Sequence, residues 1–533
     1  MSVFNVGIGG LQAAQAGLNA TSNNIANVFT PGYNREVVQF GQNQNGGVQV
    51  ATIERQFNQF IASRLNSAES NLQGLKSYQS QINQVDNLLS DPDAGIGPML
   101  QRFYASIGDL ASNPADAAAR EGVLGTANSL TAQFRAFESY LADMQTDINA
   151  QIGSEVNKAN QLTRQIADLN RDITAMRAAS GQEPNMLLNQ RDHAVAELSK
   201  IMDIRVNSAG NGQYNVSFGN GLSLVAGETA MTIQPVRDSG DPSRLSVGYI
   251  SRTGVSMELG EDVLKQGTLG GLMQFRKESL DRLQGQIGQL AASIASSFNE
   301  VHTAGTDLNG QPGQDLFTIG SPIVHANSRN TGDATAEVVI SNARDLNSAS
   351  YDVSFADGEY TAVRRDNGRP VDVTVNPDNT ITFGGLTMSV SGTPENGDRF
   401  RIYPVQNIAS NFAVNITDSA DIAAATSGNS GDNSNAMAMQ SLQNQTVVGG
   451  SATFTQAYSA IISDTGTRMS VLNANLSAQQ GLTDQLRMIQ QSESGVNLDE
   501  EAANLMRYQQ YYQANARVIQ AGITIMEELL QLR

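Results

Sequence analysis

The chain has 533 residues, a net charge of −19 at pH 7, and neither cysteine nor tryptophan. The missing cysteines exclude disulfides, thiolate metal sites and cysteine nucleophiles. The acidic balance argues against nucleic-acid and anionic-membrane partners, since both require clustered Lys and Arg. No apolar run approaches the roughly 20 residues that a membrane span needs. We therefore expect a soluble protein of several domains that binds neither nucleic acid nor membrane.

The N-terminal segment is unusual because its first 34 residues carry no charge, and Arg35 is the first ionised side chain. A Sec signal peptide needs a basic region followed by an apolar one. The opening "MSVFNVGIGGLQAAQAG" has no basic residue and contains four glycines. If the protein leaves the cell, we expect it to do so without a Sec signal peptide.

A seven-residue spacing predicts a helix in this segment. Its apolar positions are Leu11, Leu18 and Ile25, with Ala14, Thr21 and Val28 three residues further on. This is an a/d pattern of the kind that pairs helices. Pro31 ends the predicted helix, because a proline forces the residue before it out of the α region.

The C-terminal segment carries a matching pattern. Residues spaced by seven are Leu498, Leu505, Tyr512, Ile519 and Met526. Asn497 is a suitable N-cap, and three acidic residues at 499–501 favour the first turn of a helix. The pattern predicts a helix of about 35 residues with one apolar seam.

Two seams at opposite ends predict that the ends pair with each other. Each glycine within a helix costs about 1 kcal/mol relative to Ala, and ordering the backbone costs roughly 1–2 kcal/mol per residue. Each buried Leu or Ile returns only about 1.5–3 kcal/mol. We therefore expect segments 1–55 and 493–533 to be terminal assembly helices that are disordered in the monomer and ordered by neighbouring copies. The alternative is a helix packed on its own globule.

The middle of the chain predicts an α+β multidomain protein. Helical patterns at 56–202, 263–303 and 436–492 indicate a long coiled-coil-like rod, built from both the N- and C-terminal regions. Alternating residues and turn signals indicate β-rich domains inserted between the helices, a small one at 203–262 and an outer one at 304–435. The outer insertion has sixteen acidic residues, seven arginines and no lysine, which indicates a solvated acidic surface.

Catalytic patterns are absent. The three histidines, His193, His302 and His325, have no metal-site or triad spacing, and no nucleophile elbow or P-loop occurs. The segment 307–315 resembles a calcium loop but lacks the remaining acidic ligands, so a turn is the preferred interpretation. We expect neither enzymatic activity nor a cofactor.

One motif carries a family resemblance. The stretch "TSNNIANVFTPGYNR" at 21–35 resembles the N-terminal signature of the axial proteins of the bacterial flagellum. The positions that match the motif are Asn23, Asn24, Ile25, Ala26, Asn27, Pro31, Gly32 and Tyr33. Together with segments 495–520 and 269–310, it is similar to the hook-associated protein 1 family. Asn34 and Glu36 depart from the usual Ser and Gln of the motif.

The resemblance implies a structural subunit of the hook–filament junction, located outside the cell in the flagellum. It implies export through the flagellar type III apparatus, an export chaperone on the C-terminal helix, and self-assembly into a ring or helix through the terminal helices. Hook protein and a second junction protein, hook-associated protein 3, are the implied neighbours. The motif asparagines are candidates for inter-subunit or capping hydrogen bonds, or are ordinary helix-end residues.

Two other functions stay open at this point. One is another axial protein, such as hook, distal rod or a flagellin-like subunit. The other is a surface enzyme or adhesin with a helical stalk, for which the acidic outer insertion is the only support.

Overall fold

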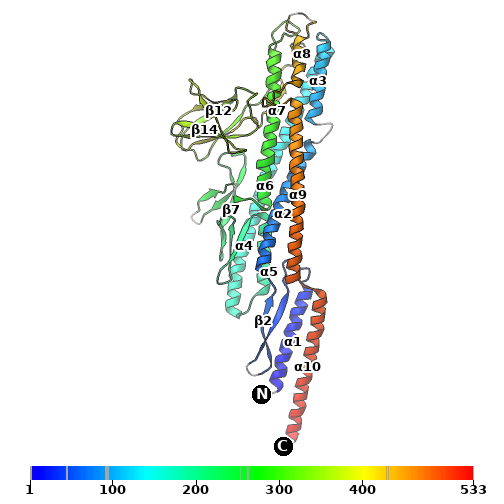
Figure 1. Cartoon of the computed structure of the whole chain (residues 1–533). Coiled ribbons are helices and arrows are strands. Elements are labelled where there is room, and N and C mark those ends of the chain that lie inside the picture. Colours follow the sequence, from blue (N-terminus) through cyan, green and yellow to red (C-terminus); the bar gives the residue numbers. More distant parts are fainter. Residues whose placement is uncertain are drawn as a thin grey trace.

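The computed structural model describes residues 3–43, 46–89, 95–251, 254–260, 263–427, 429 and 431–531. The molecule is a long helical rod, with the first and last helices side by side at one end and β domains on one flank (Figure 1). These features confirm the predicted α+β class and the β-rich insertions between helices. The terminal helices are α1 (Val3–Ala26) and α10 (Leu498–Gln531).

The rod joins helices from distant parts of the chain. They are α2 (Gln59–Leu89), α3 (Ile96–Ser112), α4 (Ala117–Ser180), α5 (Asn185–Ile201), α6 (Gly267–Phe275), α7 (Asp281–Thr303), α8 (Ser434–Ser441) and α9 (Phe454–Ser494). Helix α2 packs against both α6 and α9. A π-helical turn, Arg276–Leu280, joins α6 to α7, and short 3₁₀ turns lie at Ala409–Asn411, Ser419–Asp421 and Leu442–Asn444.

Helix α4 spans 64 residues because it has a cap at each end and apolar positions at helical spacing between the caps. The Asp116 side chain caps its first turn by accepting from the Ala118 N–H, and Gly181 ends it at φ 65°. Its apolar positions step by three and four, and Ile148, Ile152 and Val156 are fully buried. Together with the buried Ala159 they step by four, four and three, an eleven-residue spacing that keeps the apolar stripe against the rod over this length.

The small β insertion has two antiparallel sheets. One contains β3 (Ile204–Ser208), β4 (Tyr214–Phe218), β5 (Ser223–Ala226) and β6 (Thr229–Ala230). The other contains β7 (Thr232–Arg237), β8 (Leu245–Ile250) and β9 (Ser256–Glu258). Both sheets contact α4.

The outer β domain has sheets of order β11–β19–β13–β14–β15 and β12–β18–β17–β16. Their strands are β11 (Ile323–Ala326), β12 (Thr335–Ile340), β13 (Tyr351–Ala356), β14 (Glu359–Arg364), β15 (Pro370–Val371), β16 (Thr374–Val375), β17 (Ile381–Phe383), β18 (Leu386–Ser391) and β19 (Arg399–Tyr403). A further pair, β10 (Phe317–Thr318) and β20 (Ala413–Val414), packs on α7 and α4 of the rod.

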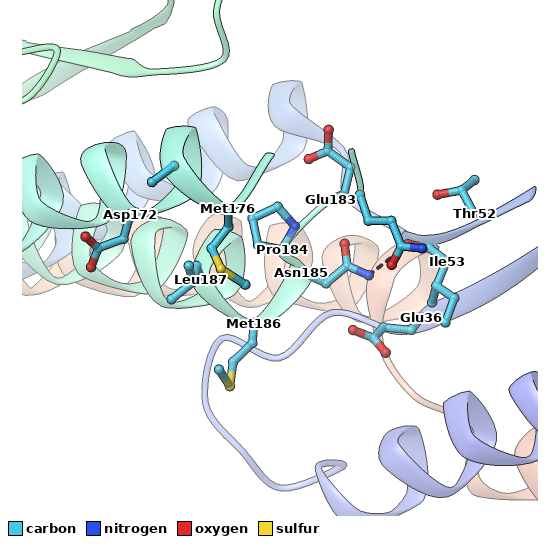
Figure 2. Close-up of a pocket in the computed structure, with 12 residues that line it drawn as sticks. Glu36, Thr52, Ile53, Asp172, Met176, Glu183, Pro184, Asn185, Met186 and Leu187 are labelled. Carbon is cyan, nitrogen blue, oxygen red and sulfur yellow. Dashed lines mark hydrogen bonds between the residues drawn. The ribbon is translucent and has the colours of Figure 1, made fainter. Parts of the chain in front are cut away.

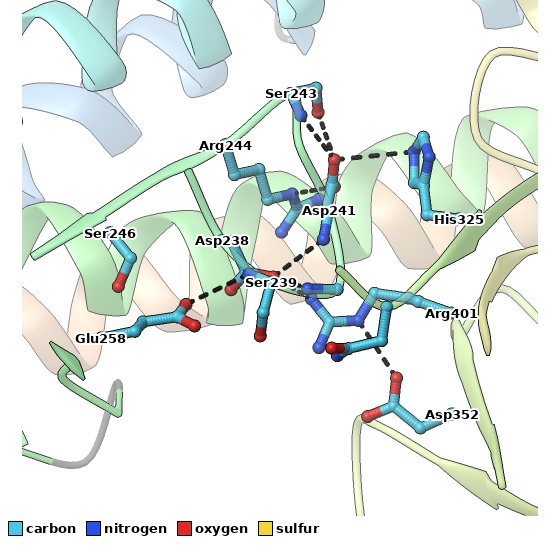
Figure 3. Close-up of polar contacts among 12 residues, drawn as sticks. Asp238, Ser239, Asp241, Ser243, Arg244, Ser246, Glu258, His325, Asp352 and Arg401 are labelled. Carbon is cyan, nitrogen blue, oxygen red and sulfur yellow. Dashed lines mark hydrogen bonds and ion pairs between the residues drawn. The ribbon is translucent and has the colours of Figure 1, made fainter. Parts of the chain in front are cut away.

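A charged cluster joins the outer domain to the small β insertion (Figure 3). The buried Asp241 carboxylate accepts from Arg244 Nε and from the Tyr403 hydroxyl, each at 2.7 Å. Arg401 reaches Asp238 at 2.8 Å. Burial raises the pKa of Asp241, but the Arg244 charge and the hydrogen bonds more than offset this, so the net pKa is lowered. The carboxylate therefore stays ionised and holds the two domains together.

One sequence-based expectation about the termini was wrong. Residues 36–43 and 46–55 are not helical, because β1 (Glu36–Gln42) and β2 (Val48–Arg55) form an antiparallel hairpin. The alternating "VQVATI" has the period and the β-branched content of a strand. The hairpin packs on α1 and connects the terminal helix to the rod.

Candidate assembly site

The terminal helices approach each other along a stripe of small residues on α1. A Cβ added to Gly17 would lie 2.7 Å from the Tyr508 ring, and one added to Gly7 would lie 2.6 Å from Ile519 Cγ1. Real side-chain carbons rarely approach below about 3.5 Å. Only glycine therefore allows α10 to come this close.

The stripe continues at the spacing of seven that the sequence indicated. Ala14 and Thr21 are each 3% exposed, and Asn24 is 1% exposed. Pairing of the chain ends was predicted and is observed, since α1 and α10 pack along each other (Figure 1). Close approaches to α10 fall at Gly7, Gly10 and Gly17. Gly10 and Gly17 lie one position before the predicted seam residues Leu11 and Leu18, and Asn24, which bonds to Glu501, lies one position before Ile25. Sequence reasoning counted these glycines only as a helix penalty, although small residues spaced by three and four were the available signal.

The predicted seam residues are only partly covered within the chain, and one of them, Ile519, takes part in the close contact at Gly7. Leu11, Leu18 and Ile25 are half-buried on α1, as are Leu505 and Ile519 on α10. Leu498, Tyr512 and Met526 are 45%, 42% and 49% exposed. The apolar side chains predicted as an assembly interface thus keep accessible surface in the single chain.

Helix α10 exposes more apolar surface than those three residues. Large hydrophobic side chains that are also exposed there are Met506, Tyr511, Val518, Ile523, Ile525 and Leu530. Exposed apolar patches of this kind mark interaction surfaces in soluble proteins.

Asn24 is the centre of the motif. Its Oδ1 accepts from the Tyr33 hydroxyl at 2.8 Å and from the Glu36 N–H at 2.9 Å. Its Nδ2 donates to the Glu36 carbonyl at 2.9 Å and to Glu501 Oε2 at 3.0 Å. All four hydrogen-bonding positions of this buried amide are occupied, so it ties α1, the hairpin and α10 to one point.

Arg35 strengthens the same junction. Its side chain pairs with Glu501 and with Glu500, each at 2.8 Å, and its backbone N–H donates to the Ser494 carbonyl at 2.9 Å. Glu501 is buried, so this pair resists screening better than a surface ion pair does. The first charged residue of the chain thus lies where the terminal helices meet α9.

The other motif asparagines act at the end of α1. Asn27 Nδ2 donates to the Asn23 carbonyl at 2.9 Å, and Thr30 Oγ1 donates to Asn27 Oδ1 at 3.1 Å. Within the single chain, these bonds lie at the C-terminal end of α1. Ala26 is the last residue of α1.

The Pro31–Tyr33 turn sits on the rod. Gly32 has φ 78°, and a Cβ there would lie 2.8 Å from His193 Cβ. Both the left-handed backbone and the close approach require glycine. Burial raises the pKa of the Tyr33 hydroxyl, and Glu36 and Glu501 raise it further. Tyr33 therefore stays protonated and can donate to Asn24.

Two further contacts fix the junction to α5. Asn34 Nδ2 donates to Asn189 Oδ1 at 2.8 Å, and Arg55 forms an ion pair with Asp192. Asn34, one of the two departures from the family motif, is buried. Its amide supplies this contact.

Nothing in the described part of the chain resembles a catalytic or metal centre. Within the residues described above, no group of three or more His, Asp or Glu side chains could hold a metal ion. In the same residues no helix combines the length and apolar character that crossing a membrane demands. His302 is buried, donates from Nδ1 to the Gln314 carbonyl, and accepts the Ala423 N–H at Nε2. Burial lowers its pKa, so it is a neutral structural histidine.

Comparison with known proteins gives matches along the chain. Residues 82–317 match the helical domain of flagellar hook-associated protein FlgK, and 325–404 match a D2-like domain of flagellar hook-associated protein 1. Residues 4–34 match the flagella basal body rod protein family, and 488–532 match the C-terminal family of the rod proteins FlgEFG.

Full-length relatives agree with these matches. Flagellar hook-associated protein 1 of Escherichia coli K12 is 37% identical, and that of Salmonella typhimurium is 38% identical, each over the whole of both chains. The solved structure of the flagellar hook junction protein FlgK from Burkholderia pseudomallei aligns with a TM-score of 0.76 at 26% identity. That alignment covers 81% of this chain and all of the other.

Proposed function

Because the chain belongs to the flagellar hook-associated protein 1 family, we propose that it is a structural subunit of the hook–filament junction that assembles through its terminal helices. The family consists of structural proteins of the flagellum, and the chain is not an enzyme. The observation that carries the assembly mode is the exposed apolar seam on α10, where Leu498, Tyr512 and Met526 face solvent in the single chain.

The terminal segments 1–55 and 493–533 order fully only among neighbouring copies. The close contact between α1 and α10 buries mainly glycine and alanine on α1, and small residues contribute little hydrophobic stabilisation. Each ordered residue loses roughly 1–2 kcal/mol of backbone entropy. Neighbouring copies that cover the exposed seam supply the missing apolar burial.

The rest of the chain divides into a helical rod and two β domains. The rod comprises 56–202, 263–303 and 436–492, and the small β insertion (203–262) and the outer β domain (304–435) lie on its flank. Amide exchange on the dilute monomer tests the division. We expect fast exchange in both terminal segments and slow exchange in the rod, and protected termini would contradict it.

The partners follow from the family and from the exposed surfaces. Copies of the chain itself form a ring or helix, with hook protein on one side and the second junction protein, hook-associated protein 3, on the other. An export chaperone covers the apolar face of α10 before assembly, because that face would otherwise be exposed in the cell. The chain then passes through the flagellar export apparatus to the outside of the cell without a Sec signal peptide.

Gene deletion tests the function directly. Cells that lack this chain should make complete hooks, bear no filaments and release filament subunits into the medium. Restoring the gene should restore filaments. Filaments of normal length in the deletion strain would refute the junction role.

A second candidate is another axial protein, since the two ends match rod-protein families. Under that hypothesis the deletion strain would lack hooks. The central matches over 82–317 and 325–404 favour the junction protein instead.

A further inference from the structure

Phe29 is the most exposed large hydrophobic side chain of the described residues, at 91%. It follows α1 within the turn of the motif. A phenylalanine in this position loses favourable burial unless another surface covers it.

The turn that carries Phe29 is held in place on both sides. Before it, Asn27 donates to the Asn23 carbonyl, and after it, the Thr30 N–H donates to the Asn27 carbonyl at 2.9 Å. Further on, Gly32 packs on His193. The ring is therefore presented by a fixed turn, and a preorganised side chain loses little entropy on binding.

A pocket of about 700 Å³ lies between the β1–β2 hairpin and the facing ends of α4 and α5 (Figure 2). Its apolar lining residues are Ile53, Met176, Pro184, Met186 and Leu187. Met176 and Met186 are 50% and 68% exposed. Flexible thioether side chains adapt to an incoming ring and make favourable sulfur–aromatic contacts.

The pocket also contains an unpaired acceptor. Asn185 is 8% exposed, and its Nδ2 donates to the Ile53 carbonyl at 2.9 Å. Its Oδ1 is buried without a hydrogen-bond partner among the described residues. Through its Nδ2 bond, Asn185 joins the start of α5 to β2 beside the pocket.

We propose that Phe29 of one copy occupies this pocket of a neighbouring copy, an interaction that rests on the junction function proposed above. Glu36 lines the pocket and is bound through its backbone to Asn24, five residues before Phe29. The Phe29 ring and the pocket therefore both lie near the Asn24 hydrogen bonds. A neighbouring copy shifted laterally can then place its Phe29 in this pocket.

Charge also favours a second copy of the turn as the occupant. Glu36, Asp172 and Glu183 line the pocket, the last two paired with Arg171 and Arg177, and the chain as a whole carries −19. Acidic segments of neighbouring copies are repelled from such a site. The turn belongs to the uncharged first 34 residues, so it approaches without repulsion. Because ring and pocket are different surfaces, the contact is heterologous and generates a ring or a helix.

Cysteine cross-linking tests the contact, because the natural chain has no cysteine. Phe29→Cys and Met186→Cys are placed in one chain, and intact flagella are treated with a short bis-maleimide. We expect a ladder of linked multimers. The matched control combines Phe29→Cys with Met437→Cys, which is 56% exposed on α8, and should give monomers. Each single variant should also give monomers.

The outcomes separate this inference from the proposed function. Three results would each overturn the inference and leave the junction role intact. They are normal filaments without a ladder, an equal ladder in the control, and a cross-link within one chain. Co-expression with the unmodified chain keeps junctions forming where the double variant assembles poorly. In addition, Phe29→Ala should be exported normally but incorporated at least tenfold less than Phe60→Ala, whose ring is 64% exposed on α2. Equal incorporation would contradict the contact.

Discussion

Replacing Gly17 by alanine tests whether the glycine stripe sets the packing of the terminal helices. Alanine is the better helix former by about 1 kcal/mol, so propensity alone predicts a more stable α1. The structure predicts the opposite result. The added Cβ would lie 2.7 Å from Cδ1 and Cε1 of Tyr508 and 2.8 Å from its Cγ, well inside ordinary contact.

The magnitude follows from these opposing effects. Tyr508 is buried, and the clash reaches the base of its ring, which a change at the hydroxyl end cannot relieve. Overpacking of this kind costs about 1–3 kcal/mol. With a clash near the upper end and a propensity gain of about 1 kcal/mol, the terminal pair loses about 2 kcal/mol per copy. This corresponds to a roughly thirtyfold smaller pairing constant.

The matched control is Gly153→Ala in α4, where an added Cβ meets no atom within 4 Å. This variant should keep the full propensity gain of about 1 kcal/mol. The assay compares the amount of chain in purified flagella with the amount in the medium. We expect Gly17→Ala to be exported normally and incorporated at least tenfold less, and Gly153→Ala to match the unmodified chain. Normal incorporation of Gly17→Ala would refute the close packing of α1 on α10.

Leu505→Asp places a charge in the half-buried seam of α10, so we expect export without incorporation, and normal junctions would contradict the interface. Burial raises the pKa of Glu138 to about 7, while an unfolded glutamate titrates near 4.3. The free energy of unfolding should therefore fall by up to about 3 kcal/mol from pH 4.5 to 7 and then level off. Urea titrations should show that Glu138→Gln removes this slope, and an unchanged slope would exclude Glu138 as its source. Asp241→Ala leaves a buried guanidinium short of a partner, at a cost of about 3 kcal/mol, so amides of 238–246 should exchange about a hundredfold faster. Asp352→Asn, on a 44% exposed side chain, should change exchange little, and equal effects would refute the role of burial.

The long helices could be predicted from the sequence because their signals are local. The apolar steps of α4, its capping Asp116 and the glycine that ends it all lie within the helix or next to it. The β1–β2 hairpin has an equally local pattern and was missed, because the whole of 1–55 was assigned to the terminal helices although the predicted helix ends at Pro31. The π-helical turn at Arg276–Leu280 has no comparable signature.

The assembly site was harder to predict because its partners are far apart in sequence. Asn24 and Glu501 are separated by 477 residues. No spacing within the motif reveals that Asn24 lies in a buried junction, while Asn27 bonds only to its own helix end. The motif pointed to this stretch as a whole, and the folded chain separates the hydrogen-bonding patterns of Asn24 and Asn27.

Helix α1 carries a stripe of small residues next to a seam of larger apolar residues, and this arrangement links subunit assembly to the ordering of the terminal helices. Small residues face α10, and the larger Leu11, Leu18 and Ile25 remain half-buried beside them. If the large residues had filled the contact within the chain, the terminal pair would be stable alone and would present little apolar surface to a neighbour. With glycine there, the pair fits closely but gains little from burial. We propose that the stabilising surface is left for the next subunit, so that the helices become rigid where the polymer grows.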